Sequence, residues 1–398
     1  MAEAGWPDKY GQSASPLSEV MIMFESIDLI KEQFSKNNIE PEVFEDSFFP
    51  FQITWFVDLR CNLRCPYCFV PDDNAYLVHP SWHSKGIDTL KILYRLKEVG
   101  VLRLDVLGGE PFLAKQTLLT LAREAFGLGI AYKSTSTNGL IYDEEIVTAL
   151  RAMDEFGIQH ILQVSVDAAS PRTYRKVRGA DLFLRVVDNI KRFVDAGLHV
   201  ELGMVLTKHN IHEIESFAEM AKNLGVEMIS FGGFMPLGRG KSVQDWHLSY
   251  KEMIRAYEVI SNLDDIRIIM PKEVSDRTCA AGIGMAAMAP NGDLYPCNMF
   301  LSMPEARLGN IFDDKLNKSN NLWYWQMVSY RVPAECDACD LPPICDGACK
   351  AVIYDHFGKF ESDRPLCYLW GRRSDVSLES QHPGKERGIQ DLYLQLPN

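Results

Sequence analysis

The chain reads Cys61-Asn62-Leu63-Arg64-Cys65-Pro66-Tyr67-Cys68 directly after an apolar run that spans Phe51 to Leu59. Three residues separate the first two cysteines and two residues separate the last two. A loop this short can turn three thiolates toward one point, but it offers no fourth. Such a ligand set suits an iron–sulfur cluster with one iron left open for chemistry. The alternatives are three unrelated buried cysteines or part of a zinc site, which needs four ligands.

From residue 51 onward the sequence alternates between strands and amphipathic helices. Apolar runs predict strands at 51–59, 101–107, 130–136, 161–167, 200–206 and 228–234. Apolar residues at helical spacing predict helices at 87–99, 113–126, 143–156, 182–196, 211–224 and 250–263. Glycines stand where left-handed helix C-caps are expected, at Gly100, Gly127, Gly157, Gly197 and Gly225.

This alternation predicts an α/β fold with a parallel sheet and right-handed crossovers. A closed barrel needs eight strand–helix units, and the pattern gives six. We therefore expect a partial, TIM-like (β/α)6 barrel, with the chemistry at the carboxyl ends of its strands.

Composition divides the chain into four parts. We expect an N-terminal helical segment at 1–49, with one helix from Pro16 to about Lys36, and the barrel core at 50–267. After residue 268 the helical periodicity fades and seven more cysteines appear before residue 368. This change predicts a separate cysteine-rich domain at 268–372, followed by a polar tail at 373–398.

Charge and hydropathy restrict the class of protein. A formal charge of −13 argues against a nucleic-acid-binding surface. No apolar run is long enough to cross a bilayer, and the N-terminus lacks the pattern of a secretory signal. Ten cysteines without such a signal indicate metal binding in a reducing compartment more than disulfides. We therefore expect a cytoplasmic protein without nucleic-acid or membrane partners.

The loop at 61–68, with an aromatic residue before its last cysteine, resembles the cluster loop of the radical S-adenosylmethionine (radical SAM) enzymes. Three strand ends carry motifs similar to the family's cofactor pocket: Gly108-Gly109-Glu110-Pro111, Ser136-Thr137-Asn138-Gly139 and Ser165-Val166-Asp167. The resemblance implies the same partial barrel. It also implies a [4Fe–4S] cluster on Cys61, Cys65 and Cys68 that binds SAM. One electron would then break the sulfonium C–S bond, giving a 5′-deoxyadenosyl radical that abstracts a substrate hydrogen.

The resemblance gives the motif residues their expected roles. Glu110 would accept hydrogen bonds from the methionine ammonium of SAM. Arg178 would hold the methionine carboxylate, with Arg175 as the competing choice. The alternatives are an ordinary Asn-Gly turn at 138–139, a solvated helix face for both arginines and plain core packing near residue 206. The expected cofactor-binding residues are Tyr67, Gly108, Gly109, Glu110, Asn138, Ser165, Asp167, Arg178 and Leu206.

The remaining cysteines form a second field: Cys279, Cys297, Cys336, Cys339, Cys345, Cys349 and Cys367. Their spacing resembles the SPASM extension of radical SAM enzymes, which implies two auxiliary [4Fe–4S] clusters and three clusters in all. The family's ligation would place one auxiliary cluster on Cys279, Cys297 and Cys349, near the active site. The distal cluster would take Cys336, Cys339, Cys345 and Cys367. Seven cysteines leave one iron without a cysteine ligand, and two zinc sites are the alternative.

Among SPASM enzymes the sequence favours a peptide- or protein-modifying maturase that installs a thioether, a cross-link or an oxidation. Sulfatase maturases resemble this chain around Tyr295-Pro296-Cys297, but their catalytic aspartate is replaced here by Asn298. Because an amide cannot act as that base, formylglycine formation is disfavoured. Radical oxidation or rearrangement of a small molecule, such as a sugar or amino-acid derivative, is the alternative. A non-catalytic iron–sulfur scaffold fits less well because the cofactor pocket looks complete. Expected partners are a peptide or protein substrate and an electron donor such as flavodoxin or ferredoxin. A separate leader-peptide-binding protein is a further candidate.

Overall fold

The computed structural model describes residues 51–70, 88–269, 281–282, 284–313 and 349–358. The predicted N-terminal helix, the polar tail and half of the ten cysteines lie outside these residues. Within them, no helix has the length and hydropathy that a membrane span requires.

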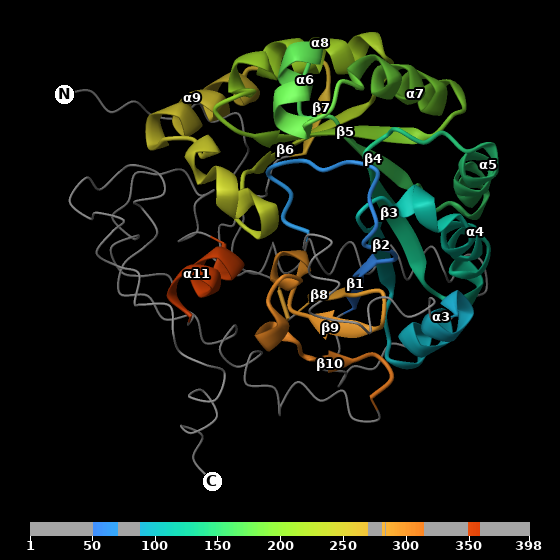
Figure 1. The fold of residues 1–398 in the computed structure, drawn as a ribbon. Coiled ribbons are helices and arrows are strands. Elements are labelled where there is room, and N and C mark those ends of the chain that lie inside the picture. The colour runs from blue at the N-terminus through green and yellow to red at the C-terminus, as the bar shows by residue number, and fades with distance from the viewer. Residues whose placement is uncertain (1–50, 71–87, 270–280, 283, 314–348, 359–398) are drawn as a thin grey trace, which may run out of the picture.

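In the part of the chain that the structure describes, a ten-stranded sheet forms the centre, and its strands follow the order β10-β9-β8-β1-β2-β3-β4-β5-β6-β7 (Figure 1). All neighbours from β8 through β1 to β7 pair in parallel, while β9 and β10 are antiparallel additions. The described strands therefore confirm the α/β class with its parallel sheet. The strands are β1 Gln52–Phe56, β2 Arg103–Leu107, β3 Ala131–Thr137, β4 Ile161–Ser165, β5 His199–Leu206, β6 Met228–Gly233, β7 Arg267–Ile269, β8 Met285–Met288, β9 Asp293–Tyr295 and β10 Gly309–Asn310.

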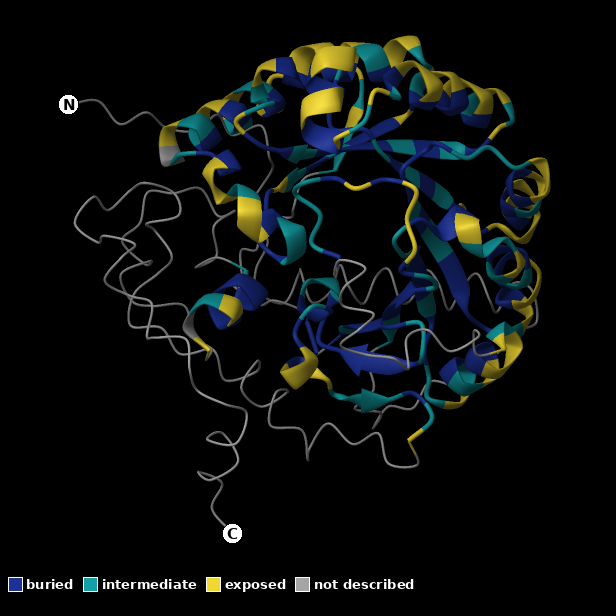
Figure 2. Ribbon diagram, viewed as in Figure 1, coloured by how far each residue is buried: buried dark blue, intermediate teal, exposed yellow. Residues whose placement is uncertain are grey.

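Helices cover the outer side of the curved sheet, and their exposed residues face outward (Figure 2). The predicted ones are α3 Thr89–Glu98, α4 Lys115–Glu124, α5 Glu144–Ala152, α7 Phe183–Asp195, α8 Ile214–Asn223 and α9 Tyr250–Ser261. Among the described residues, two further α-helices were not predicted, α6 Pro171–Arg178 and α11 Lys350–Phe357. The C-cap prediction at Gly127 was wrong, because Gly129 takes the left-handed conformation there with φ of 79°.

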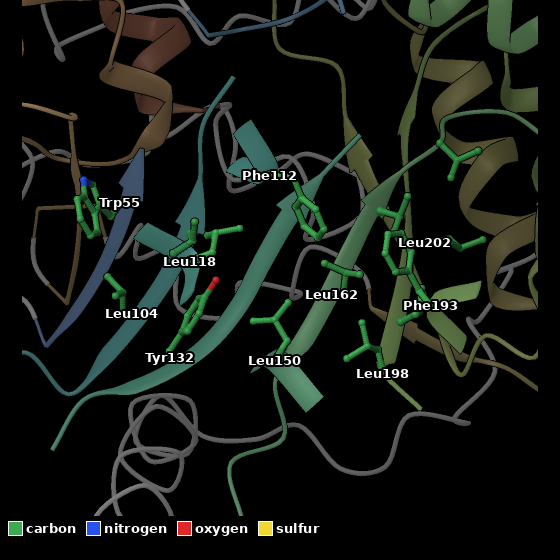
Figure 3. Close-up of a cluster of buried hydrophobic side chains, with 14 of the residues drawn as sticks. Trp55, Leu104, Phe112, Leu118, Tyr132, Leu150, Leu162, Phe193, Leu198 and Leu202 are labelled. Carbon is green, nitrogen blue, oxygen red and sulfur yellow. The ribbon is translucent and has the colours of Figure 1, made fainter. Parts of the chain in front are cut away.

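The main core lies between the sheet and these helices (Figure 3). Alternate strand residues such as Leu104, Tyr132 and Leu162 are fully buried against Leu118 and Leu150 of the helices. Burial of each such side chain contributes about 1.5–3 kcal/mol relative to exposure. This layer fixes the strands, and with them the loops that follow their carboxyl ends.

The sheet extends beyond the six predicted strands at both edges. β7 pairs with β6 over three residues, and β8 pairs with β1 from Gln52↔Met285 to Trp55↔Met288. The prediction of six strands was therefore too low, because strands this short carry no readable periodicity. β8 follows residue 268, so the sheet is continuous from the expected core into the expected cysteine-rich region.

Candidate functional site

β1 leads directly into the loop at 57–70 that carries the first three cysteines. Figure 1 shows this segment crossing the opening of the curved sheet. Cys65 is buried, Cys68 is half-buried and Cys61 is exposed, and none of the five described cysteines forms a disulfide. Because parallel strands end at the same edge, this loop meets the motifs that follow β2, β3 and β4.

The end of β2 lies against the backbone of the cluster loop. The backbone N–H of Gly109 donates to the carbonyl oxygen of Asp58 at 2.7 Å, and the backbone N–H of Glu110 donates to the carbonyl oxygen of Arg60 at 2.8 Å. A Cβ atom at Gly109 would lie 2.3 Å from the carbonyl oxygens of Leu59 and Arg60. A Cβ atom at Gly108 would lie 2.5 Å from the carbonyl oxygen of Asp58. Only glycine permits this approach, so the motif holds the loop in place.

Glu110 joins the ends of β2 and β3 through a fully buried carboxylate. Its Oε1 accepts from the backbone N–H of Phe112 at 3.0 Å and from Thr137 Oγ1 at 2.8 Å. Its Oε2 accepts from the backbone N–H of Asn138 at 2.8 Å. Burial raises the pKa of Glu110, and these three donors act in the opposite direction.

Asn138 reaches from the end of β3 to the cluster loop. Its Nδ2 donates to Asn62 Oδ1 at 2.7 Å and lies 3.8 Å from Cys61 Sγ. The backbone N–H of Leu63 also donates to Cys61 Sγ, at 3.4 Å. Hydrogen bonds to cysteine sulfur tune iron–sulfur clusters, so these donors fit a cluster ligand at position 61.

A triad of the half-buried Tyr67 with the buried Asp167 and Arg178 links the cluster loop to the ends of β4 and α6. Tyr67 Oη donates to Asp167 Oδ2 at 2.5 Å, and Arg178 Nη1 donates to the same oxygen at 2.9 Å. Arg178 Nη1 also donates to Tyr67 Oη at 2.8 Å. Asp167 has a positive φ of 64° and accepts from the backbone N–H of Val205 through Oδ1. Arg178, expected to hold a ligand carboxylate, is thus paired with Asp167, while its buried Nε has no partner among the described residues.

The two remaining predicted positions lie on neighbouring strands. Ser165 ends β4 half-buried and is 3.4 Å from the side chain of Gln163. Leu206 ends β5 and belongs to the main core, as the core-packing alternative describes. Arg175 lies apart from the triad, exposed on the outer side of α6.

Sequence reasoning missed a second support of the cluster loop, the segment Gly238-Arg239-Gly240 after β6. The backbone N–H of Arg239 donates to the carbonyl of Cys68 at 2.9 Å, and its Nε donates to that of Cys65 at 3.0 Å. A Cβ atom at Gly238 would lie 2.5 Å from the carbonyl oxygen of Phe69. The sequence feature that could have indicated this support is an arginine between two glycines, shortly after a predicted strand.

Two cysteines of the second field pack near the first loop. Cys297 and Cys349 belong to the same apolar cluster as Cys68 and Phe69. Cys297 follows β9, and Cys349 is the N-cap residue of α11. Cys279, Cys336, Cys339, Cys345 and Cys367 lie outside the described residues.

The described residues provide ligands for a cluster but no preformed metal site. Across those ranges, no group of three or more His, Cys, Asp or Glu side chains is arranged to hold a metal ion. Burial raises the pKa of the Cys61 and Cys68 thiols. Three cysteines outside disulfides on one loop, with N–H donors near Cys61, are nevertheless a donor set that suits iron–sulfur chemistry.

Comparison with known proteins identifies the family. Residues 59–221 match the family model of the radical SAM superfamily. The chain is a member of the radical SAM superfamily of enzymes. The match covers the segment from the cluster loop to α8.

Two curated relatives of this radical SAM enzyme differ in what their names describe. One is the antilisterial bacteriocin subtilosin biosynthesis protein AlbA of Bacillus subtilis, 26% identical over 315 residues, which cover 75% of this chain and 67% of AlbA. The other is a probable GTP 3′,8-cyclase of Saccharolobus islandicus, 31% identical over 209 residues, or 52% of this chain. The chain spans just under two thirds, 64%, of that cyclase's length.

Solved structures share the fold of this radical SAM enzyme. SuiB of Streptococcus suis, bound to S-adenosylmethionine, matches with a TM-score of 0.61 at 17% identity and covers 89% of this chain and 83% of SuiB. The protein anSMEcpe with bound AdoMet matches with a TM-score of 0.61 at 20% identity over 80% of this chain and 94% of that protein. At these identities the likeness concerns the fold alone, an α/β fold with a parallel sheet like that of the radical SAM partial barrel.

Proposed function

We propose that this protein is a radical SAM maturase that abstracts a hydrogen from a peptide or protein substrate. Cys61, Cys65 and Cys68 would hold the SAM-binding [4Fe–4S] cluster, and the 268–372 region would hold two auxiliary clusters. SAM, when bound, supplies a one-electron reductive cleavage and an oxidising radical. The observation that carries the proposal is the packing of Cys297 and Cys349 with Cys68 in one apolar cluster.

That packing supports an auxiliary cluster close to the active site. Cys297 and Cys349 lie on segments that are distant in sequence, yet both belong to the apolar cluster that includes Cys68 and Phe69 at the end of the cluster loop. Lys241 Nζ, beside the loop, pairs with Asp355 of α11 at 2.5 Å, which ties the helix of Cys349 to the core. Cys279 would complete this set, and Cys336, Cys339, Cys345 and Cys367 would hold the distal cluster.

The protein's own groups would bind and orient SAM at the strand ends. A carboxylate has about four acceptor positions, and Glu110 accepts three described bonds. A SAM ammonium would take the remaining position. Arg178 would keep its pair with Asp167 and use its unpartnered Nε toward the methionine carboxylate. Tyr67, Asn138, Ser165 and Leu206 would border the rest of SAM.

Relatives guide the proposed substrate class. AlbA is named for the biosynthesis of subtilosin, a bacteriocin. SuiB was solved with a precursor peptide, and anSMEcpe with the Kp18Cys peptide. We carry peptide binding to this chain as part of the proposal, with a one-electron donor such as flavodoxin or ferredoxin as a second partner.

The test is anaerobic incubation of the reconstituted enzyme with SAM, dithionite and a candidate precursor peptide. Mass spectrometry should show a peptide that has lost two hydrogens, with one 5′-deoxyadenosine formed for each peptide modified. A peptide that remains unchanged in mass and configuration across candidates, while 5′-deoxyadenosine accumulates, would contradict the peptide assignment.

Small-molecule chemistry is the second candidate, favoured by the 31% identity to the GTP 3′,8-cyclase. A sugar or amino-acid derivative was the predicted small-molecule substrate, and the cyclase adds a nucleotide to that class. Turnover of GTP in the same assay, without any peptide, would favour it. Formylglycine formation has less support, because Asn298 begins the short helix after Cys297 in place of a carboxylate base.

A further inference from the structure

A basic depression lies on the outer side of α6, away from the inward-facing triad. Its volume is about 870 Å³, and polar side chains of α6 and of the segment after β5 line it. Four cations contribute to the lining: Arg172, Arg175, Lys176 and Lys208. All four are exposed, as is His212 beside them.

The acid in the lining, Glu213, is occupied by the protein itself. Its carboxylate accepts from the backbone N–H of Ala169 at 2.7 Å, from Ser170 Oγ at 2.5 Å and from Thr173 Oγ1 at 2.7 Å. Glu213 is 8% exposed. Its role is to fix the start of α6 against the segment after β5, so the exposed part of the depression is cationic.

This concentration of positive charge is unusual for a chain with a net charge of −13. Clustered like charges on a surface steer oppositely charged partners during association. The helix that carries the depression ends beside the cluster loop. A Cβ atom at Gly179, the C-cap of α6, would lie 3.3 Å from the carbonyl oxygen of Arg64.

The part of α6 that lines the depression therefore lies within one helix length of the cluster loop. Eight residues at 1.5 Å rise span about 12 Å. Arg64 and Cys61 of the loop are exposed as well. A protein seated on the depression would thus stand next to the loop that binds the cluster.

We propose that this basic surface, formed by Arg172, Arg175, Lys176 and Lys208, docks the acidic face of a small electron-transfer protein that reduces the cluster. This inference rests on the proposed function, because only a cluster that is reduced in each turnover needs such a donor. In the step itself the donor loses one electron and the cluster gains it, with no bond made or broken. Redox encounters are small and transient, and their rates depend on charge steering more than on buried area.

The test compares two reductants on the same reconstituted holoenzyme. We would measure 5′-deoxyadenosine formation driven by dithionite and by reduced flavodoxin, at rising NaCl, for wild type and for Arg172→Glu/Lys208→Glu. The control variant Arg123→Glu/Lys191→Glu makes the same charge change at exposed sites on α4 and α7. Thermal melting checks that each variant is folded.

The docking variant should lose the flavodoxin-driven rate by on the order of tenfold and keep the dithionite-driven rate. The wild-type flavodoxin-driven rate should fall as salt screens the surface, and the control should behave as wild type. Equal flavodoxin-driven rates in wild type and docking variant would refute the docking proposal and leave the proposed function standing. So would a loss confined to peptide turnover, which would assign the surface to an acidic peptide segment. No dithionite-driven product from fully loaded enzyme would refute the proposed function, and docking with it.

Discussion

Glu110 shows how one side chain can organise the ends of two strands. Its motif was readable from the sequence because a glycine pair before a carboxylate, at the end of a predicted strand, is a recognisable pattern. Its partners were not readable. Thr137 and the backbone N–H of Asn138 come from the next strand, so their contacts with Glu110 depend on strand pairing.

Replacing Glu110 with Gln should destabilise the fold. The amide could keep one oxygen for Phe112 and Thr137, but its NH2 group would then face the backbone N–H of Asn138. An unsatisfied buried donor costs about 1–3 kcal/mol, and we expect the free energy of unfolding to fall by that amount. Urea unfolding of the variant measures this, with exposed Glu124→Gln as control. Unchanged stability would contradict the assigned hydrogen bonds.

His160 is a second buried residue with a measurable consequence. It is 2% exposed, lies 3.1 Å from Thr135 Oγ1, and burial lowers its pKa from 6.5 to about 3. Between these values the unfolded chain binds a proton that the folded chain does not. Stability from this residue is therefore complete above pH 6.5 and is lost as pH falls toward 3.

The difference in stability between wild type and His160→Gln should reveal this proton. It should rise with pH by about 1.4 kcal/mol per pH unit below pH 6.5 and be flat above it. Denaturant unfolding across this pH range measures the slope. The control is His212→Gln, which removes a histidine whose side chain is 64% exposed. A flat difference for His160→Gln would mean that the ring is protonated in the fold.

At the scale of elements, prediction succeeded where a strand or helix buries a repeating face. The six strands from β1 to β6 and the long helices carry that repeat. The two extra parallel strands are too short to show it, because β7 and β8 have three and four residues. Helix α6 does bury one face, but in eight residues that face holds only two large apolar side chains, Tyr174 and Val177. The short strands β7 and β8 are placed by pairing with β6 and β1, which would otherwise be the edges of the six-stranded sheet.

The contact between the end of β2 and the cluster loop can be tested with a glycine-to-alanine substitution, which adds one methyl group. Gly109→Ala would place Cβ 2.3 Å from two backbone oxygens, so the loop must move. We expect a lower melting temperature and less iron bound after anaerobic reconstitution.

The matched control is Gly127→Ala. A Cβ atom there would have no neighbour within 4 Å, and the residue has no positive φ. Iron content and melting temperature should equal or exceed the wild-type values. Equal iron content in both variants would show that the glycine pair does not position the loop.

At the scale of the whole molecule, the candidate site joins segments that the sequence keeps far apart. The positions of the motifs at strand ends predicted that Glu110, Asn138 and Asp167 would lie beside the cluster loop, and the structure places them there. These positions could not predict that Arg178 pairs with Asp167, that Arg239 supports the loop, or that β8 joins β1. These are consequences of how the chain closes on itself, and no local pattern encodes them.

The most direct measurement compares wild type with the variant Cys61→Ala/Cys65→Ala/Cys68→Ala after anaerobic reconstitution. For each protein we would measure the iron bound per chain and the 5′-deoxyadenosine formed. With dithionite and SAM, wild type should release 5′-deoxyadenosine. The variant should release none and bind about four fewer iron atoms per chain, while it keeps the iron that we propose for the second cysteine field. A variant that binds as much iron as wild type and still cleaves SAM would show that residues 61–68 do not hold the reactive cluster.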